Sequence, residues 1–409
     1  MDRSLRKTDK IYLVHIMLFF ICLATMNVIN RYYYFIYIAF ALFCIAPKRK
    51  LYMDAVPMAS LLMLAIAWMV FSPDSMISIF GLVKPFTYLF CYIMGMALLD
   101  DDRDSLENSN SYKLFYWLVV AIAGGSFAHY ILNWITNLSS FDTRNTVDFW
   151  SKSIMAATGQ AALACLPLAV AVACLFSKNN KKLKLVAWIT IVLIIVYNLV
   201  LSGRTLFLLL IILILTAFMH RMLTQKKGKF RLLVIFLLVI LLLIFAYQIN
   251  LFGIKIYFEN SPMYDRFFGD NSTTDLNEDG RMEHKLFYLQ NLFNYPWGGG
   301  HMHDQTGYAH DIYLDTYDQA SVFAFLGIVI YMINALIHFL KFIKNKKLPF
   351  TLRQTVFCIY IAIFLEFMIE PILVGMPWMF ASFCLIDGYV SRILMQSKNI
   401  TPAMNRSKE

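Results

Sequence analysis

The sequence predicts an all-α polytopic membrane protein with about twelve transmembrane helices and a large extracytoplasmic loop between helices 9 and 10. Hydrophobic residues make up 59% of the 409 residues, and charged residues make up only 15%. The mean hydropathy is +0.60, and long apolar runs recur along the chain. Soluble globular domains do not have this composition. Because membrane helices pack side by side, we predict a single transmembrane domain over residues 1–409.

The predicted spans are apolar runs near the length that crosses the hydrocarbon core of a bilayer, roughly 17 to 25 residues. Two of them, 32–46 and 205–219, are short. In chain order the predicted spans are 11–29, 32–46, 55–72, 76–99, 114–135, 154–176, 185–201, 205–219, 232–249, 320–340, 355–370 and 377–394.

The lysine and arginine residues predict which side each loop occupies. They cluster in alternate loops, which the positive-inside rule assigns to the cytoplasm, together with both termini. This pattern accounts for the net charge of +10 without a nucleic-acid partner. All seven cysteines lie in apolar runs without metal-ligand spacing, so neither disulfides nor zinc are predicted. The basic clusters are 3–7, 48–50, 178–184, 221–231, 341–347 and 398–408.

The longest polar stretch, 250–319, is then an extracytoplasmic loop subdomain that we expect to carry part of the active site. A structureless loop of this length would be unusual unless it were functional. It contains turn signals and one helix-like run, 282–293. A second outer element, 136–152, carries Arg144.

Ionisable residues inside predicted spans mark functional candidates, because burying a charge in a membrane is unfavourable. Lys84 precedes Pro85, which we expect to break its helix, and Glu366 and Glu370 are spaced to share one helical face. These three side chains either contact substrate or form a buried Lys/Glu pair that holds helices together.

Three arginines, Arg204, Arg266 and Arg281, are predicted on the same outer side. A guanidinium group binds phosphate oxygens bidentately, so an outer cationic site suggests a phosphate-bearing substrate. Each arginine taken alone can equally be an interfacial anchor or a partner of loop carboxylates.

Several motifs follow one another in the second half of the chain. Ser-Gly-Arg-Thr at 202–205 opens a span, with Leu208 completing an Arg-x3-Leu motif. Downstream, Asp-Gly-Arg at 279–281 precedes the helix-like run and the Pro-Trp-Gly-Gly-Gly turn at 296–300. A His-Asp segment at 309–315 then leads into the next span. In their order, spacing and predicted topology these motifs resemble those of the O-antigen ligase and polymerase superfamily.

The resemblance implies a metal-independent, inverting glycosyltransferase of the bacterial inner membrane that uses glycans carried by undecaprenyl diphosphate, without nucleotide sugar or other cofactor. It implies a leaving diphosphate stabilised by Arg204, Arg266 and Arg281, with Lys84 and Arg144 as further cations. A histidine that titrates near neutrality is suited to deprotonate the acceptor hydroxyl, and His310 is the candidate base. Asp311, Asp315 and Asp318 share a helix face and are candidates to bind sugar hydroxyls; the alternative is a solvated helix start.

Polymerase and ligase activities both stay open within this family. Asp311 stands where Asn, Ser or Gln is usual, and Ser321 and Ala324 stand where glycine is common, which favours the polymerase. A lipid-linked sugar flippase or transporter is the alternative from another class. Whether a chain-length regulator binds alongside also stays open. Two loop patterns hint at metal ligands, His301 to Asp311 and Asp275 to Gly280, but neither has a standard spacing.

Overall fold

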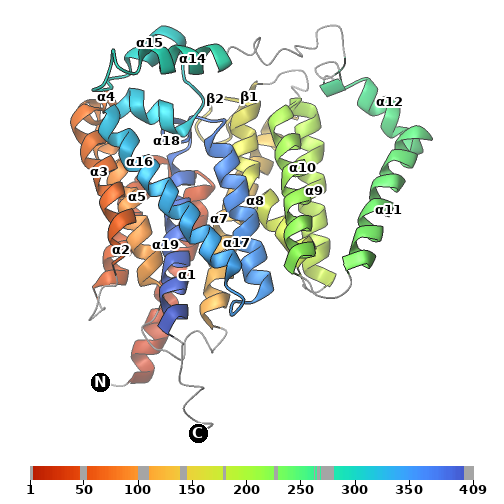
Figure 1. Cartoon of the computed structure of the whole chain (residues 1–409), viewed down its shortest axis with the longest axis horizontal. Helices are drawn as coiled ribbons and strands as arrows, with labels where there is room; N and C mark the ends of the chain where they lie inside the picture. The colour runs from red at the N-terminus through yellow and green to blue at the C-terminus, as the bar shows by residue number, and fades with distance from the viewer. Residues whose placement is uncertain are drawn as a thin grey trace. The chain divides into compact units, whose positions relative to one another are not determined.

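The computed structural model describes residues 3–46, 53–99, 110–138, 145–177, 181–224, 229–261, 263–264, 268 and 281–399. Over these residues the protein is helical apart from one two-stranded β-hairpin. Eight of the described helices are long and apolar enough to cross a membrane (Figure 1). The predicted all-α polytopic membrane class is therefore confirmed.

The chain divides into two compact units, each assembled from segments that are distant in sequence. Unit 1 comprises Met1–His129, Arg281–Leu352 and Glu366–Glu409. Unit 2 comprises Tyr130–Gly280 and Arg353–Leu365. The sequence carries no composition shift at these boundaries, and a single transmembrane domain stays a prediction.

Unit 1 holds most of the helices. They are α1 (Arg3–Thr25), η1 (Asn30–Tyr32), α2 (Tyr33–Ile45), α3 (Ala55–Phe71), α4 (Pro73–Ile77), α5 (Ile79–Ala97), most of α7 (Asn110–Thr136), α14 (Arg281–Asn291), α15 (His301–Thr306), α16 (Ile312–Lys344), α18 (Ile372–Gly375) and α19 (Pro377–Asn399).

Unit 2 holds the β-hairpin and a second group of helices. They are β1 (Asn145–Val147), β2 (Ile154–Ala156), α8 (Ala157–Phe176), α9 (Lys181–Leu201), α10 (Arg204–Thr224), α11 (Lys229–Gln248), η2 (Leu251–Gly253), α12 (Ile254–Glu259) and most of α17 (Phe350–Phe367). The strands pair antiparallel with Thr146 opposite Met155.

Every predicted apolar run coincides with a helix, but the boundaries correct three expectations. The run at 76–99 begins as α5 only at Ile79, after the separate short helix α4. Pro85 lies inside α5 and does not break it, in keeping with the tolerance of membrane helices for proline. Helix α17 ends at Phe367, so Glu366 and Glu370 do not share a helical face. Pro371 explains this end, because a proline disfavours helical geometry at the residue before it.

The core of unit 1 depends on helices that approach one another closely. A Cβ atom on Gly95 of α5 would lie 2.2 Å from the Leu385 carbonyl oxygen of α19, and one on Gly388 would lie 2.1 Å from that of Tyr92. Small residues permit such backbone approach in membrane bundles. Helices α5 and α19 therefore form one rigid layer, and α3 packs against α16 beside it.

A buried polar network also ties these helices together. The His338 ring on α16 lies between two carboxylates, with Nε2 3.0 Å from Asp54 Oδ2 and Nδ1 3.0 Å from Asp387 Oδ1. Asp54 also accepts hydrogen bonds from the hydroxyls of Tyr92 at 3.2 Å and Ser391 at 2.7 Å. Each ring nitrogen of His338 therefore faces a carboxylate oxygen from a different segment.

Replacing His338 by leucine is expected to destabilise the protein by about 3–5 kcal/mol, because removing one partner leaves buried charge uncompensated. Asp387 is fully buried, so its carboxylate would lose the His338 contact without gaining water. Thermal unfolding in detergent, followed by size-exclusion chromatography, measures the effect. His338→Gln, which keeps a donor, serves as the control and should lose less. Equal unfolding temperatures for His338→Leu and wild type would contradict the assignment.

Candidate functional site

Residues 281–319 of the predicted loop subdomain have a small hydrophobic core of their own. Its buried members come from α14, α15, the segment after α15 and the start of α16. The predicted helix-like run is confirmed as α14. Figure 1 shows α14 and α15 lying across one end of the unit 1 helices. The buried side chains are Tyr288, Met302, Ala309, Leu314 and Tyr317.

The glycine-rich turn docks into a kink in α16. Ala320 and Ser321 leave helical geometry, with φ of 89° at Ser321. In an uninterrupted helix the amide of Val322 would donate to the carbonyl of Asp318. Here Val322 donates to the Pro296 carbonyl at 3.0 Å, and the Asp318 carbonyl accepts from Gly300 at 2.8 Å. The turn therefore satisfies both backbone groups that the kink frees.

Gly298 is the closest point of this docking. Its φ is +73°, and an added Cβ would lie 2.5 Å from the Ser321 amide nitrogen. Gly298→Ala is therefore expected to displace the turn and to lower any activity of the site about tenfold or more, since misplacement by about an ångström can do this. Gly375→Ala is the control, because a Cβ there meets nothing within 4 Å. Activity equal to wild type in Gly298→Ala would show that the turn does not position the site.

His310 lies in the short segment between α15 and α16, which neighbouring elements hold in place. Its φ is +55°, an uncommon conformation for a side-chain-bearing residue. Asp315 accepts from the amides on both sides of it, Ala309 at 2.8 Å and Asp311 at 3.0 Å. From α14, Tyr288 donates to the Gly307 carbonyl at 2.9 Å. A strained residue held by such bonds is typical of functional sites.

The environment of His310 keeps its imidazole neutral. Burial first, and then the electrostatic effects of Arg281, His284 and Lys285, together lower its pKa from 6.5 to about 4. The expectation that His310 titrates near neutrality is therefore wrong for the free protein. Its buried Nδ1 has no hydrogen-bond partner among the described residues. The ring is thus uncharged at neutral pH, and its Nδ1 is buried and unpaired among the described residues.

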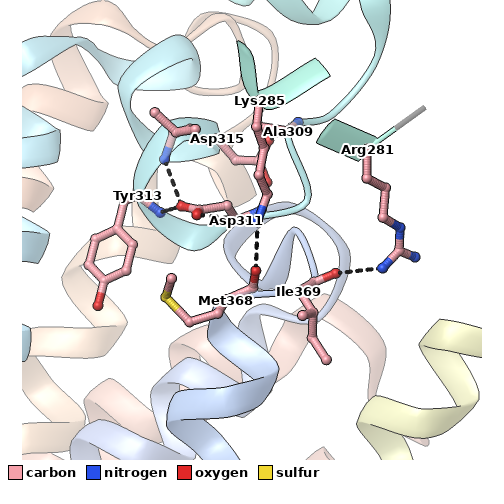
Figure 2. A network of polar contacts seen from close by, with 9 residues as sticks. Arg281, Lys285, Ala309, Asp311, Tyr313, Asp315, Met368 and Ile369 are labelled. Atoms are coloured by element: carbon pink, nitrogen blue, oxygen red, sulfur yellow. Dashed lines mark hydrogen bonds and ion pairs between the residues drawn. The ribbon is translucent and has the colours of Figure 1, made fainter. Parts of the chain in front are cut away.

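Arg281 and Lys285 fix α14 to the turn that follows α17 (Figure 2). Arg281 donates to the Ile369 carbonyl at 3.3 Å and lies 3.5 Å from a Glu370 carboxylate oxygen. Lys285 donates to the Met368 carbonyl at 3.0 Å and lies 3.6 Å from Asp311 Oδ2. We refer to the group formed by Arg281, Lys285, His310, Asp311 and Glu370 as the loop cluster. Its two cations stay partly exposed, at 29% and 26% of the side chain.

The aspartates at the start of α16 bind backbone groups. Asp311 caps the helix by accepting from Tyr313 at 2.9 Å and Leu314 at 3.1 Å, as Figure 2 shows for Tyr313. Asp318 accepts from the amides of Met302 at 2.8 Å and His303 at 3.1 Å. Asp315 and Asp318 are 3% and 0% exposed, so a solvated helix start is wrong. Sugar binding by Asp311 and Asp315 stays a prediction.

Lys84 is buried at 4% exposure but pairs with Asp74 of α4 rather than with a glutamate. The two charged groups are 2.9 Å apart, and the ammonium lies 4.4 Å above the Trp68 ring. Asp74 is also near the loop, because its charge helps to raise the pKa of Tyr308, mainly raised by burial. The pair therefore fixes α4 to α5 beneath the loop subdomain.

Glu366 is fully buried, and neither of its carboxylate oxygens has a hydrogen-bond partner among the described residues. The backbone carbonyl of Glu366 accepts a hydrogen bond from the Glu370 amide at 3.1 Å. The proposed Lys/Glu pairing of Lys84 with these glutamates is not formed. Instead, Glu370 carries the ion pair with Arg281.

Of the other predicted arginines, only Arg204 lies among the described residues. Arg204 is half-buried and begins α10 in unit 2. The turn before it is held by Asn198, which donates to the Gly203 carbonyl at 2.8 Å. Arg144 and Arg266 lie outside the described residues. In the described part of the chain, no group of three or more His, Cys, Asp or Glu side chains is arranged to hold a metal ion.

The sequence interpretation missed Lys285 and Asp74. Lys285 had a signal, because it follows Arg281 at helical spacing within a predicted helix, and the two side chains must therefore share a face. Asp74 had none, since its pairing with Lys84 depends on how α4 folds back on α5.

Comparison with known proteins adds no assignment: no protein-family model matches the chain, and no curated protein matches it.

Proposed function

We propose that this protein is a polysaccharide polymerase of the bacterial inner membrane. It joins oligosaccharide repeat units carried by undecaprenyl diphosphate on the extracytoplasmic face, as in O-antigen or capsule assembly. The proposal includes about twelve spans with both termini in the cytoplasm and the loop cluster outside. The observation that carries it is the loop cluster itself. A neutral imidazole, whose buried Nδ1 has no partner among the described residues, stands near two partly exposed cations at the ends of membrane helices.

Glycosyl transfer needs a base for the acceptor hydroxyl and positive charge at the leaving diphosphate, and the loop cluster offers both. The acceptor hydroxyl oxygen attacks the anomeric carbon while the bond from that carbon to the diphosphate oxygen breaks. The hydroxyl proton passes to the imidazole of His310. Negative charge develops on the departing diphosphate, and Arg281 and Lys285 stabilise it. Attack from the side opposite the leaving group inverts the anomeric centre.

We expect bound diphosphate to raise the pKa of His310. Cations near the ring lower its pKa in the free protein, and two bound phosphate groups would offset those cations. The pKa of His310 then rises in the complex, toward the range in which a general base is effective. The role of Arg204 in the proposal rests only on the resemblance of residues 202–205 to a motif of the ligase and polymerase superfamily.

Purified protein tests the proposal with a synthetic undecaprenyl-diphosphate-linked repeat unit and a metal chelator. Products carrying two or more repeats on the lipid carrier, with release of undecaprenyl diphosphate, are expected. Transfer only to an added lipid A core acceptor would assign the protein as a ligase. Movement of intact substrate across proteoliposomes without new glycosidic bonds would assign it as a transporter.

A further inference from the structure

Helix α14 exposes a narrow apolar stripe. Met282, Leu286 and Leu289 are 47%, 48% and 52% exposed, and Phe293, in the turn after the helix, is 93% exposed. The steps of four, three and four residues place them on one side of a helix. Four large apolar side chains that line up in this way are not the scattered exposure that any protein surface shows.

The stripe is not a misplaced core face, because a different face of α14 makes the contacts within unit 1. Tyr288 is fully buried in the small core of the loop subdomain. Arg281 and Lys285 bind the turn after α17, and His284 contacts the Tyr308 carbonyl at 3.1 Å. These four residues recur at helical spacing about a third of a turn away from the stripe.

Contacts of α14 place it at the level where membrane helices end. Lys285 binds the carbonyl of Met368, the residue directly after the end of α17. After the helix, the Trp297 ring stacks on Phe71, the last residue of α3, with ring centroids 5.5 Å apart. Trp297 is itself 59% exposed, and tryptophan favours the membrane surface. Figure 1 shows α14 running across the ends of the unit 1 helices rather than along them.

We propose that α14 is an interfacial helix whose apolar stripe inserts into the lipid at the membrane surface. A helix at this depth with one apolar side and cations on a neighbouring side has the form of a monotopic membrane anchor. A protein partner is the weaker alternative. A standard protein interface buries about 800 Å² on each side, and four half-exposed side chains on one helix offer much less.

The insertion fixes the depth of Arg281 and Lys285 relative to the bilayer, since both lie on the same short helix as the stripe. This inference rests on the fold and does not need the proposed activity. Under the proposed function, it holds the two cations at the level of a lipid-linked diphosphate. The lipid-linked substrate would then reach the two cations by diffusing laterally within the membrane.

Photo-crosslinking tests the inference. p-Benzoylphenylalanine replaces Leu286 or Leu289, and matched controls replace Glu283 or Gln290, which are exposed on the polar side of the same helix. The full-length protein is reconstituted into phosphatidylethanolamine and phosphatidylglycerol vesicles that contain no polyprenyl lipid. After illumination, intact-protein mass spectrometry counts phospholipid adducts. Monodisperse elution before reconstitution shows that each variant is folded.

At least fivefold more phospholipid adduct at the stripe positions than at the controls is expected. Equal adducts at all positions, or none, would overturn the proposal. Crosslinks from Leu286 or Leu289 to a second protein chain would also overturn it, and would identify the stripe as a protein interface instead. Because no substrate is present, the result is independent of whether the protein is a glycosyltransferase.

Discussion

Arg281→Ala is expected to lower the rate of chain extension about 100-fold to 1,000-fold, the effect of losing one donor that stabilises developing charge. Arg281 is the partly exposed guanidinium of the loop cluster, next to His310. Initial rates with the purified protein and the lipid-linked repeat unit measure the effect. Arg281→Lys should recover part of the rate, because it keeps the charge but loses the bidentate geometry. Lys255→Met, which removes a cation from an exposed pair on α12, should change little.

A purely structural role of Arg281 predicts a different outcome. Arg281 also pairs with the buried Glu370, so Arg281→Ala alone leaves that carboxylate without its cation. Arg281→Ala combined with Glu370→Gln removes this imbalance. Activity restored in the double variant would show that Arg281 serves only as a counter-ion and would contradict its role at the leaving group.

His310→Ala is expected to lower the rate about 100-fold to 10,000-fold, the contribution of a general base. The pH dependence distinguishes this role from a structural one. A base must be unprotonated, and the pKa of His310 is lowered to about 4. Burial raises the pKa of Asp315, which binds the amides on both sides of His310, to about 7, so a change in activity near pH 7 reports Asp315. The part of the activity that depends on His310, measured at low substrate concentration to report the free enzyme, should stay level from pH 8 to about 5. It should fall only near pH 4, well below the ordinary value of 6.5.

Two changes should shift the fall in activity that we expect near pH 4. Lys285→Met removes one of the positive charges that lower the pKa of His310, so the fall should move to higher pH. Saturating substrate should move it in the same direction, because the bound diphosphate offsets the cations. A wild-type profile without an acid limb near pH 4 would contradict the assignment of His310.

Hydropathy predicted the helices well for a physical reason. Within a membrane each segment must satisfy its own backbone hydrogen bonds, so a long apolar run has few alternatives to a helix. Every predicted run is helical, and α14 was also recognised from the loop sequence. Charged residues were selected for the same reason. Lys84, Glu366 and Glu370 were selected because they lie in predicted spans, and all three are buried.

Partners and boundaries could not be predicted, because they depend on packing between segments distant in sequence. The network of Asp54, His338 and Asp387 joins residues from the N-terminal and C-terminal parts of the sequence of unit 1. The kink at Ser321 is stable only because the glycine-rich turn supplies the missing backbone partners. The pKa of His310 reflects burial and the charges of α14, neither of which a residue pattern contains.

The most direct test is the polysaccharide pattern of a strain that lacks the gene, complemented with wild-type protein or with Arg204→Ala, Arg281→Ala or His310→Ala at matched membrane levels. We predict that wild type restores long chains. The three variants should leave single repeat units that still reach their final acceptor. Long chains stranded on the lipid carrier would instead mean a ligase, and normal ladders from all three variants would contradict the proposed site.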